Sequence, residues 1–594
     1  MRWMAFLVLS AALLLVAPAY GVDKAEPKVL VTGSPIHATN GVMFDAKDRL
    51  YIASSVGREI VVMDPETGKI LDRLGPKVGV ESPDDLAFGP DGSLYWTAIL
   101  TGEVGRLSPD GVKTSQSVAL GVNAITFSDD GRLFVASDFL GDSLYELDPN
   151  LVKPPRLIAE NLGFLNGMDW GPDGFLYGPI WTKGKVVRID VDKGTITTVA
   201  DGFGVPAAVK FDSRGRLYVV DQMKGEVSRV DLKTGSKEVI TSGLFGLDNL
   251  AFDSHDRLFV SNTQDGSISE VLPGGKTRTV SPGGMIAPGG VAVLPTADGE
   301  SVFVADLFTL REFDGRTGEA KSVQRALIDI PGITTPMTVS ADGNRLVLSS
   351  WFGNAVQVWD PQTRQVLEQL DFGLPLNAIR FQGDLVVAGP ASVVRVNAAD
   401  PTVRVTLADG LKVPAGLAAA GDDLWASERG SGRVLQIVAG GKQLPEPLPV
   451  ATGLSSPEGL AITPGGNLLV VEAGAGRLSL INTRTGQVSA VAEGLELGAE
   501  GTPGMPATWG FNGVAVGPSG AIYVTGDIGS VLYRIEAVKE APAIAPAAPP
   551  ATGGGGLQPG PQSSVAAWWW ALAAGGVLLL AAGGWYARRR RRAG

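Results

Sequence analysis

The chain of 594 residues contains no cysteine and only two histidines, His37 and His255. Without cysteine, no disulfide can hold an exported domain together, so its stability must come from a hydrophobic core, which this length allows. Two histidines argue against a two-histidine zinc site and against a Ser-His-Asp triad. We interpret both as loop histidines, although His37 is close enough in sequence to Asn40 to act as a proton shuttle.

Positive charge is also scarce. Leaving out Arg2 and the five arginines at 588–592 reduces the 50 basic residues to 44, against 62 acidic ones, which is a net charge of −18 for the part between the two ends. Such a surface repels a phosphate backbone. We therefore expect no nucleic-acid partner.

The two ends carry the long apolar segments that the rest of the chain lacks. Residues 1–21 have the layout of a secretory signal peptide, and residues 565–587 are uncharged, edged by aromatic residues and long enough to span a bilayer. The arginine cluster in the tail 588–594 belongs on the cytoplasmic side, and the Pro-, Ala- and Gly-rich residues 541–564 are typical of a disordered stalk. These features predict a single-pass membrane protein with a large extracellular or periplasmic part. A processed sorting tail is the alternative, although no LPxTG motif is present.

One pattern recurs twelve times along the chain, and AFGPDGSLYWTA at 87–98 shows it: a tight turn between two apolar strands. Successive copies are 38 to 46 residues apart, except for a last gap of 54. This is the period of four-stranded propeller blades. The apolar residues before the turns are Phe44, Phe88, Phe127, Trp170, Phe211, Phe252, Val293, Val339, Phe381, Ala419, Ile462 and Val516.

The pattern therefore predicts an all-β fold of antiparallel blades. Because single rings usually hold four to eight blades, we divide the chain into two tandem six-bladed propellers, residues 28–283 and 284–540. The segment 28–32 would then complete the sixth unit, and the segment 277–280 the twelfth. A five-plus-seven division and one large ring remain alternatives.

The residue four positions before each of those apolar anchors should lie at the mouth of a central channel. In the first half these residues are Asn40, Asp84, Asn123, Asn166, Ala207 and Asp248. Carboxylate and amide oxygens around one axis suit a hard divalent cation, Ca²⁺ above all, with Asp84, Asn123, Asn166, Asp248 and Asn40 as ligands. The same residue types also cap turns, which is the alternative interpretation.

The second half has a different set at the corresponding positions. It reads Gly289, Thr335, Asn377, Ala415, Glu458 and Asn512, with a single carboxylate. We expect a binding role for Asn377, Glu458 and Asn512 rather than a metal site. Trp509, in the long loop 497–510, either covers this second channel or packs on its own blade.

Three repeats carry a family resemblance: LNGMDWGPDGFLY (165–177), SPDDLAFGPDGSLYW (82–96) and SPEGLAITPGGNLLVVE (456–472). They resemble the SMP-30/gluconolactonase-like and NHL-repeat propellers. The resemblance implies a six-bladed fold, a divalent metal in the channel, and hydrolysis of lactones or related esters. It implies that Asn166 is an amide ligand and that Asp84 or Asp248 binds metal or acts as the base.

The chain departs from that family at three points. Ala207 stands where the family's order would place an aspartate, the Glu-Gly repeat at Glu458 lies in the other half, and family enzymes are single propellers. The scarcity of histidine also weakens a resemblance to virginiamycin B lyase, a related propeller whose mechanism depends on histidine.

Two classes of function follow. The first is a membrane-anchored binding or scaffold protein that presents its loop faces to a protein, glycan or small-molecule ligand at the cell surface. The second is a metal-dependent lactonase or esterase with Asp84 and Asp248 as catalytic residues. The sequence leaves open whether the protein is an enzyme.

Overall fold

The computed structural model describes residues 24–326 and 332–537. The signal peptide, the stalk, the membrane-spanning segment and the basic tail that the sequence predicts all lie outside these residues. Within the described ranges, no helix has the length and apolar character that crossing a bilayer requires. The helical elements there are four single 3-10 turns: η1 (Pro76–Val78), η2 (Trp181–Lys183), η3 (Arg429–Ser431) and η4 (Ala473–Ala475).

The described chain forms twelve antiparallel sheets of four strands, consistent with propeller blades. From the innermost strand outward, the first six are β2 (Val42–Phe44), β3 (Leu50–Ser54), β4 (Glu59–Met63), β5 (Ile70–Leu74); β6 (Pro83–Phe88), β7 (Leu94–Ala98), β8 (Glu103–Leu107), β9 (Lys113–Ser117); β10 (Val122–Phe127), β11 (Leu133–Ser137), β12 (Ser143–Leu147), β13 (Arg156–Glu160); β14 (Asp169–Trp170), β15 (Leu176–Ile180), β16 (Lys185–Asp190), β17 (Thr195–Ala200); β18 (Pro206–Phe211), β19 (Leu217–Asp221), β20 (Glu226–Val230), β21 (Lys237–Thr241); β22 (Leu247–Phe252), β23 (Leu258–Asn262), β24 (Ile268–Val271), β25 (Thr277–Ser281).

The other six sheets follow the same plan, except that the last one ends in the first strand of the chain. They are β26 (Val291–Thr296), β27 (Gly299–Asp306), β28 (Thr309–Asp314), β29 (Ala320–Arg325); β30 (Thr338–Asp342), β31 (Arg345–Ser350), β32 (Ala355–Asp360), β33 (Gln365–Asp371); β34 (Asn377–Phe381), β35 (Asp384–Ala388), β36 (Val393–Val396), β37 (Arg404–Ala408); β38 (Pro414–Ala420), β39 (Asp423–Glu428), β40 (Arg433–Ala439), β41 (Lys442–Thr452); β42 (Pro457–Ile462), β43 (Leu468–Glu472), β44 (Arg477–Ile481), β45 (Val488–Glu493); β46 (Val514–Val516), β47 (Ile522–Gly526), β48 (Val531–Ile535), β1 (Lys28–Thr32).

Burial follows the order of strands within each sheet. The second strands are the most buried: β3, with the sequence LYIAS, is buried at every residue, and β27, β31, β35 and β39 are buried at every residue after the first, because both faces of these strands pack against neighbouring sheets. The fourth strands are the most exposed; β9, with the sequence KTSQS, alternates between exposed and half-buried residues. The core is therefore a series of layers between sheets, which suits the near-continuous apolar runs in the second strands.

The closure of the sheets differs from the expected one. We predicted that residues 28–32 complete the sixth unit and residues 277–280 the twelfth, and both predictions are wrong. β1 pairs antiparallel with β48, Lys28 opposite Arg534 and Thr32 opposite Val531, whereas β25 pairs with β24 of its own sheet. The sixth unit supplies its own fourth strand, so its edge is occupied, and only the last unit has an edge that β1 can fill.

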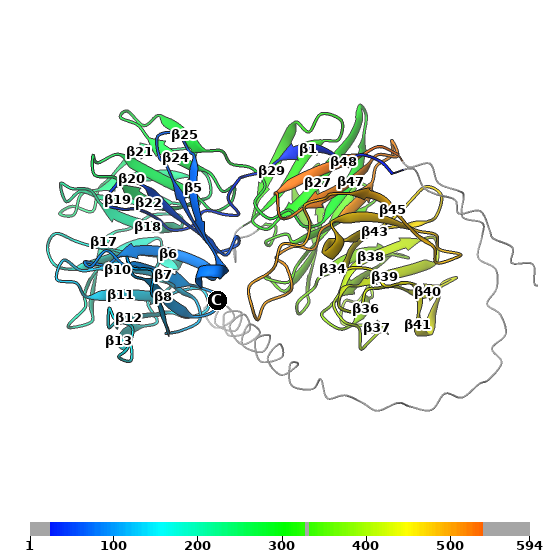
Figure 1. Ribbon diagram of the computed structural model, residues 1–594, viewed down its shortest axis with the longest axis horizontal. Coiled ribbons are helices and arrows are strands. Elements are labelled where there is room, and N and C mark those ends of the chain that lie inside the picture. Colours follow the sequence, from blue (N-terminus) through cyan, green and yellow to red (C-terminus); the bar gives the residue numbers. More distant parts are fainter. Residues whose placement is uncertain (1–23, 327–331, 538–594) are drawn as a thin grey trace, which may run out of the picture.

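The inner strands contact one another in two closed circuits. One runs through β2, β6, β10, β14, β18 and β22 and back to β2, and the other through β26, β30, β34, β38, β42 and β46 and back to β26. Figure 1 shows the two halves as separate lobes that lie side by side, the first blue to green and the second green to orange, with β1 in the second. The first lobe is thus inserted between β1 and β26, and the chain crosses between the lobes twice.

The two circuits close by different means. In the first lobe, side chains join the first and sixth sheets: the Thr39 hydroxyl donates to the Asn262 carbonyl at 2.9 Å, and the Ser254 hydroxyl donates to Asp48 Oδ2 at 2.6 Å. In the second lobe, the pairing of β1 with β48 adds a strand to the closing sheet. The N-terminal strand β1 therefore stabilises the second lobe, although it precedes the first lobe in the chain.

The lobes contact each other through loops at the ends where the inner strands begin. Phe139, which follows β11, stacks on Phe352, which follows β31, with ring centroids 5.3 Å apart. Arg58 of the first lobe forms a 3.2 Å ion pair with Glu500 of the second. The channel mouths of the two lobes therefore lie on the sides that contact each other.

Candidate functional site

Two carboxylates at the mouth of the first channel have no hydrogen-bond partner among the residues that the structure describes. Asp84 lies in β6 and Asp248 in β22, and Asp84 is only 5% exposed. Neither carboxylate hydrogen-bonds to any residue that the structure describes. Burial raises the pKa of Asp84 well above its ordinary value, and the neighbouring Asp248 and Asp85 raise it further. Burial, with Asp85 and Asp138, also raises the pKa of Asp248 to about 7.

A third carboxylate at this mouth, Asp138, is one that sequence reasoning missed. It follows β11, is 5% exposed, and accepts hydrogen bonds from Asn123 Nδ2 on both oxygens, at 3.2 and 3.3 Å. Burial raises its pKa well above the ordinary value, and repulsion from Asp84 adds to this effect. The antiparallel register, with Val122 opposite Ser137, brings the end of the second strand to the start of the inner one. A search at the ends of second strands as well as the starts of inner strands would have found Asp138.

The other amides of the predicted ring serve local structure. Asn40 Oδ1 accepts a hydrogen bond from the Ser55 hydroxyl at 3.1 Å, and Asn166 Oδ1 accepts one from the Gly167 N–H at 2.7 Å. These contacts match the turn-capping interpretation of the sequence. The structure therefore brings Asp84, Asp248 and Asn123 together with Asp138, while Asn40 and Asn166 direct their oxygens to neighbouring protein donors.

A second polar layer lies next to this cluster. Asn249 Nδ2 donates to Asp85 Oδ1 at 3.1 Å, and the Lys210 ammonium, on a residue 6% exposed, is 3.8 Å from Asp169. Burial raises the pKa of Asp85 and of Asp169, and Lys210 offsets part of that rise in both. The single ammonium thus compensates these two carboxylates, and the pKa of Asp84, Asp138 or Asp248 shows no such offset from a cation.

The donor set fits a divalent cation only in part. Among the described residues, no three or more His, Cys, Asp or Glu side chains are placed to hold a metal ion. A hard cation at this mouth would be held by the unbonded oxygens of Asp84 and Asp248 and by Asn123 Oδ1, with water completing the shell. Of the positions that the family resemblance singles out, the Asn166 oxygen accepts the Gly167 N–H, and Ala207 offers no side-chain ligand.

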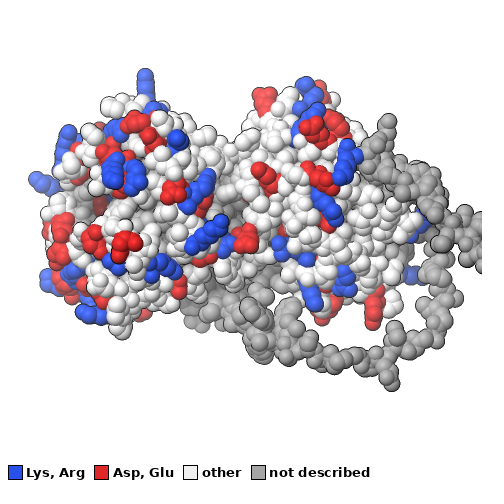
Figure 2. All heavy atoms as spheres, viewed as in Figure 1, with Lys and Arg blue, Asp and Glu red and all other residues white. Residues whose placement is uncertain are grey.

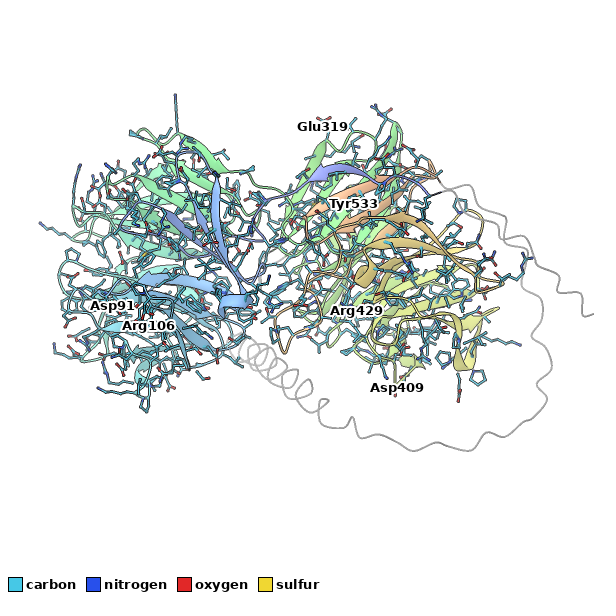
Figure 3. The ribbon with its side chains drawn as sticks, viewed as in Figure 1. Asp91, Arg106, Glu319, Asp409, Arg429 and Tyr533 are labelled. Carbon is cyan, nitrogen blue, oxygen red and sulfur yellow. The ribbon has the colours of Figure 1, made fainter. Side chains whose placement is uncertain are left out.

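The carboxylate of the second ring is structural. Glu458 in β42 is fully buried; Arg429 Nε donates to its Oε1 at 2.9 Å and the Asn512 N–H donates to its Oε2 at 2.7 Å. Burial and the nearby Asp527 raise the pKa of Glu458 to about 7, although Arg429 acts in the opposite direction. Figure 3 shows Arg429 in the second lobe. Both oxygens of Glu458 are therefore committed to protein donors.

Trp509 belongs to an apolar cluster at the mouth of the second channel. Its ring stacks on Trp351 with centroids 5.6 Å apart, and its carbonyl accepts a hydrogen bond from Trp351 Nε1 at 2.9 Å. The cluster also contains Met337 and Leu376, which directly precede the inner strands β30 and β34, and Phe511, three residues before β46. Apolar side chains, rather than a polar ring, therefore cover this mouth.

His37 faces the second lobe. Its Nδ1 is 2.8 Å from the Ile286 carbonyl oxygen, and its Nε2 is 3.1 Å from the Ile528 carbonyl oxygen. It lines a cavity of about 270 Å³ between the lobes, together with Arg58 and Trp509. Its ring nitrogens are thus engaged between the lobes, which gives the proton-shuttle interpretation no support.

No family model and no curated protein matches the chain. Among solved structures, a streptogramin B lyase is 15% identical, with a TM-score of 0.35, over 47% of this chain and 94% of that one. A protein assigned as a gluconolactonase is 14% identical, with a TM-score of 0.34, over 44% of this chain and 93% of that one. The extracellular domain of a one-component system from B. thetaiotaomicron is 11% identical, with a TM-score of 0.30, over 86% and 82%. Identities of 11–15% and TM-scores of 0.30–0.35 carry no conclusion about the family or the activity of this chain.

Proposed function

We propose that the protein is a membrane-tethered binding protein that acts outside the cytoplasm and binds a cation at the mouth of its first channel. In this proposal each lobe is a six-bladed propeller, the second one completed by β1. The inner-strand circuits support the blade number. The terminal segments 1–21 and 565–587 support export and tethering. Acidic and basic side chains are interspersed over both lobes on the face drawn in Figure 2, as suits a soluble outer domain.

The observation that carries the proposal is the uncompensated charge of Asp84, Asp138 and Asp248. Repulsion from at least one of the other two raises the pKa of each carboxylate. Asp84 and Asp248 also make no hydrogen bond to any described residue. Burying unpaired carboxylates costs several kcal/mol per group, unless they are protonated or paired with positive charge. A cation would relieve this cost, and Ca²⁺ is the ion that oxygen donors of this kind favour.

A second candidate is a metal-dependent lactonase or esterase. Asp248 favours it, because this carboxylate is unbonded and partly exposed, so that a substrate or water can reach it. A bound divalent cation would polarise an ester carbonyl. In this candidate Asp84 and Asn123 would hold the cation, and Asp248 would take the proton from the attacking water.

The cation proposal is tested by thermal unfolding of the purified full-length protein after chelation, with and without added Ca²⁺. At a hundredfold excess over the dissociation constant, a bound ion adds about 2.7 kcal/mol, which is roughly 5–10 °C for a lobe of this size. We expect that shift in the wild type, and its loss in Asp84→Asn and Asp248→Asn. Without Ca²⁺ these variants should unfold at a higher temperature than the wild type, because a repulsive charge is gone.

Asp110→Asn, at an exposed turn, is the matched control and should keep the full shift. An equal shift in all variants, or none in the wild type, contradicts the cation proposal. Turnover of a lactone that needs Ca²⁺ and disappears in Asp248→Asn, while Asp110→Asn remains active, would favour the enzyme over the binding protein.

A further inference from the structure

His37 connects the two lobes through its side chain. It lies between β1, in the second lobe, and β2, in the first. The Ser54 hydroxyl donates to the His37 carbonyl at 2.6 Å, and the neighbouring Ile36 is buried in the core of the first lobe. The imidazole ring points the other way: Nδ1 is 2.8 Å from the Ile286 carbonyl oxygen, and Nε2 is 3.1 Å from the Ile528 carbonyl oxygen.

Both of these carbonyl groups are held by the second lobe. The Ile286 N–H donates to Asp306 Oδ1 at 2.8 Å, and the Ile286 side chain is fully buried. Ile528 lies in the turn between β47 and β48, where its N–H donates to the Glu496 carbonyl at 3.3 Å. The backbone of His37 is therefore fixed to one lobe, and the two acceptors of its ring are fixed to the other.

The two contacts require two protons on the ring. A carbonyl oxygen only accepts, and a neutral imidazole has a single N–H, whereas an imidazolium has two. The Ser530 hydroxyl, 3.3 Å from Nδ1, could donate to an unprotonated Nδ1, but the Ile286 oxygen is closer and would then face the nitrogen lone pair. The geometry thus suits the protonated ring, and a neutral ring leaves one of the two carbonyl groups without its donor.

We propose that His37 is a pH-dependent latch between the lobes: the imidazolium bonds to both carbonyl groups, and loss of its proton breaks one bond and loosens the contact. Histidine side chains change their charge between about pH 5 and 8. The arrangement that binds the additional proton is favoured at low pH, so the contact weakens as the pH rises through this range. The cavity of about 270 Å³ that His37 lines lies in the same contact, and the latch therefore also controls access to it.

Charged groups of both lobes face His37 or this cavity, namely Glu59, Arg73, Arg58, Glu81, Glu500 and Asp527. Arg73 pairs with Glu59. Arg58 pairs with Glu81 at 2.9 Å and with Glu500 at 3.2 Å. Burial raises the pKa of Glu59 and of Asp527, so both can also change charge as the solution becomes acidic. A change with pH must therefore be assigned to His37 by substitution.

The test measures the distance between the lobes in the purified full-length protein, with a chelator present so that the cation proposed for the first channel plays no part. Because the chain has no cysteine, Leu120→Cys and Asp409→Cys introduce the only two sites for spin labels. Both positions are exposed, Leu120 in the first lobe and Asp409 in the second. Pulsed electron paramagnetic resonance should show one main distance at pH 5.5. We expect the share of longer distances to rise roughly fivefold at pH 8, as suits the loss of one hydrogen bond.

Two histidine variants in the labelled protein assign this change. His37→Gln keeps a hydrogen-bond donor but cannot gain a proton, so its distances should be the same at both pH values. His255→Gln is the matched control, because the His255 side chain is 72% exposed in a turn away from the segment that crosses between the lobes. It should show the same change with pH as the labelled protein with both histidines.

Nuclear magnetic resonance of the protein with ¹⁵N-labelled histidine provides a second measurement, which needs no variant and serves if His37→Gln does not fold. The chain has only two histidines, so the two rings can be observed separately. At pH 5.5 both ring N–H groups of His37 should exchange with water more slowly than those of His255. Distances that ignore pH, an equal change in His37→Gln, or exchange at His37 as fast as at His255 overturns the proposal.

Discussion

At the scale of single residues, the structure identifies Asp138 as a member of the acidic cluster, which the repeat pattern of the sequence did not. Asp84 and Asp248 could be predicted, because both stand at a fixed offset from a recurring apolar residue. Asp138 stands at the end of a second strand, and only the register of β10 against β11 brings it to Asn123. Asn40 and Asn166 fit the pattern equally well, but their oxygens bond to nearby donors, and no spacing rule distinguishes that from a ligand role.

Glu458 gives a prediction for the pH dependence of stability. Its pKa in the folded protein is raised to about 7 from an ordinary value of 4.5, so its contribution to stability is complete below 4.5 and is lost as the pH rises through 7. The loss for one such group is about 3 kcal/mol. In Glu458→Gln the fall in stability between pH 5 and 8 should be smaller than in the wild type, as measured by urea unfolding of the second lobe.

The matched control for this experiment is Glu472→Gln. Burial raises the pKa of Glu472, but hydrogen bonds from Arg477 and Ser479 outweigh that effect, and the net pKa is lowered. Replacing Glu472 should therefore remove stability that is present above pH 4.5, without reducing the fall toward pH 8. The same pH slope in the wild type and in Glu458→Gln would show that burial of Glu458 does not govern it.

At the scale of elements, β1 decides which lobe the N-terminal strand stabilises. The sequence identified two facts correctly: residues 28–32 form an outer strand without a unit in front of them, and the last unit lacks an outer strand. The sequence did not determine which sheet residues 28–32 complete, since an outer strand has the same alternating pattern in any blade. The pairing of β1 with β48 settles this, because every other sheet has four strands of its own.

Replacing residues 28–32 by a Gly/Ser segment of equal length should therefore destabilise the second lobe, not the first. The edge of β48 loses its strand partner, and Val31 leaves the apolar cluster that it shares with Val293 and Phe313. We expect differential scanning calorimetry to show a lower second-lobe transition and an unchanged first-lobe transition. Lys28→Ser, which keeps the apolar residues of the strand, should leave both in place. A lower first-lobe transition alone would contradict the pairing.

At the scale of the whole molecule, the arrangement of lobes places the two channel mouths in different surroundings. The first mouth holds unpaired carboxylates, whereas an apolar cluster covers the second. Phe139 directly follows Asp138, so the interface between the lobes adjoins the acidic cluster. Because Phe139 stacks on Phe352 of the second lobe, a shift of one lobe against the other would also change the surroundings of the acidic cluster.

Phe139→Ala should loosen this interface. A stacked aromatic pair contributes about 0.5–1.5 kcal/mol beyond its buried area. We expect faster proteolysis of the crossing segment near 282–284 and a larger radius of gyration in X-ray scattering. Phe372→Ala, which removes an aromatic ring within the second lobe, is the control and should change neither. Unchanged proteolysis and scattering in Phe139→Ala would show that other contacts hold the lobes together.

The sequence by itself determined the all-β fold, the strand order within each unit and the position of Asp84 and Asp248, because turn residues, apolar runs and fixed offsets act over short distances along the chain. The tertiary structure decided the partner of β1, the presence of Asp138 in the acidic cluster and the apolar cover over the second channel. Each of these depends on which distant segments meet, and segments with the same local pattern can meet in several ways.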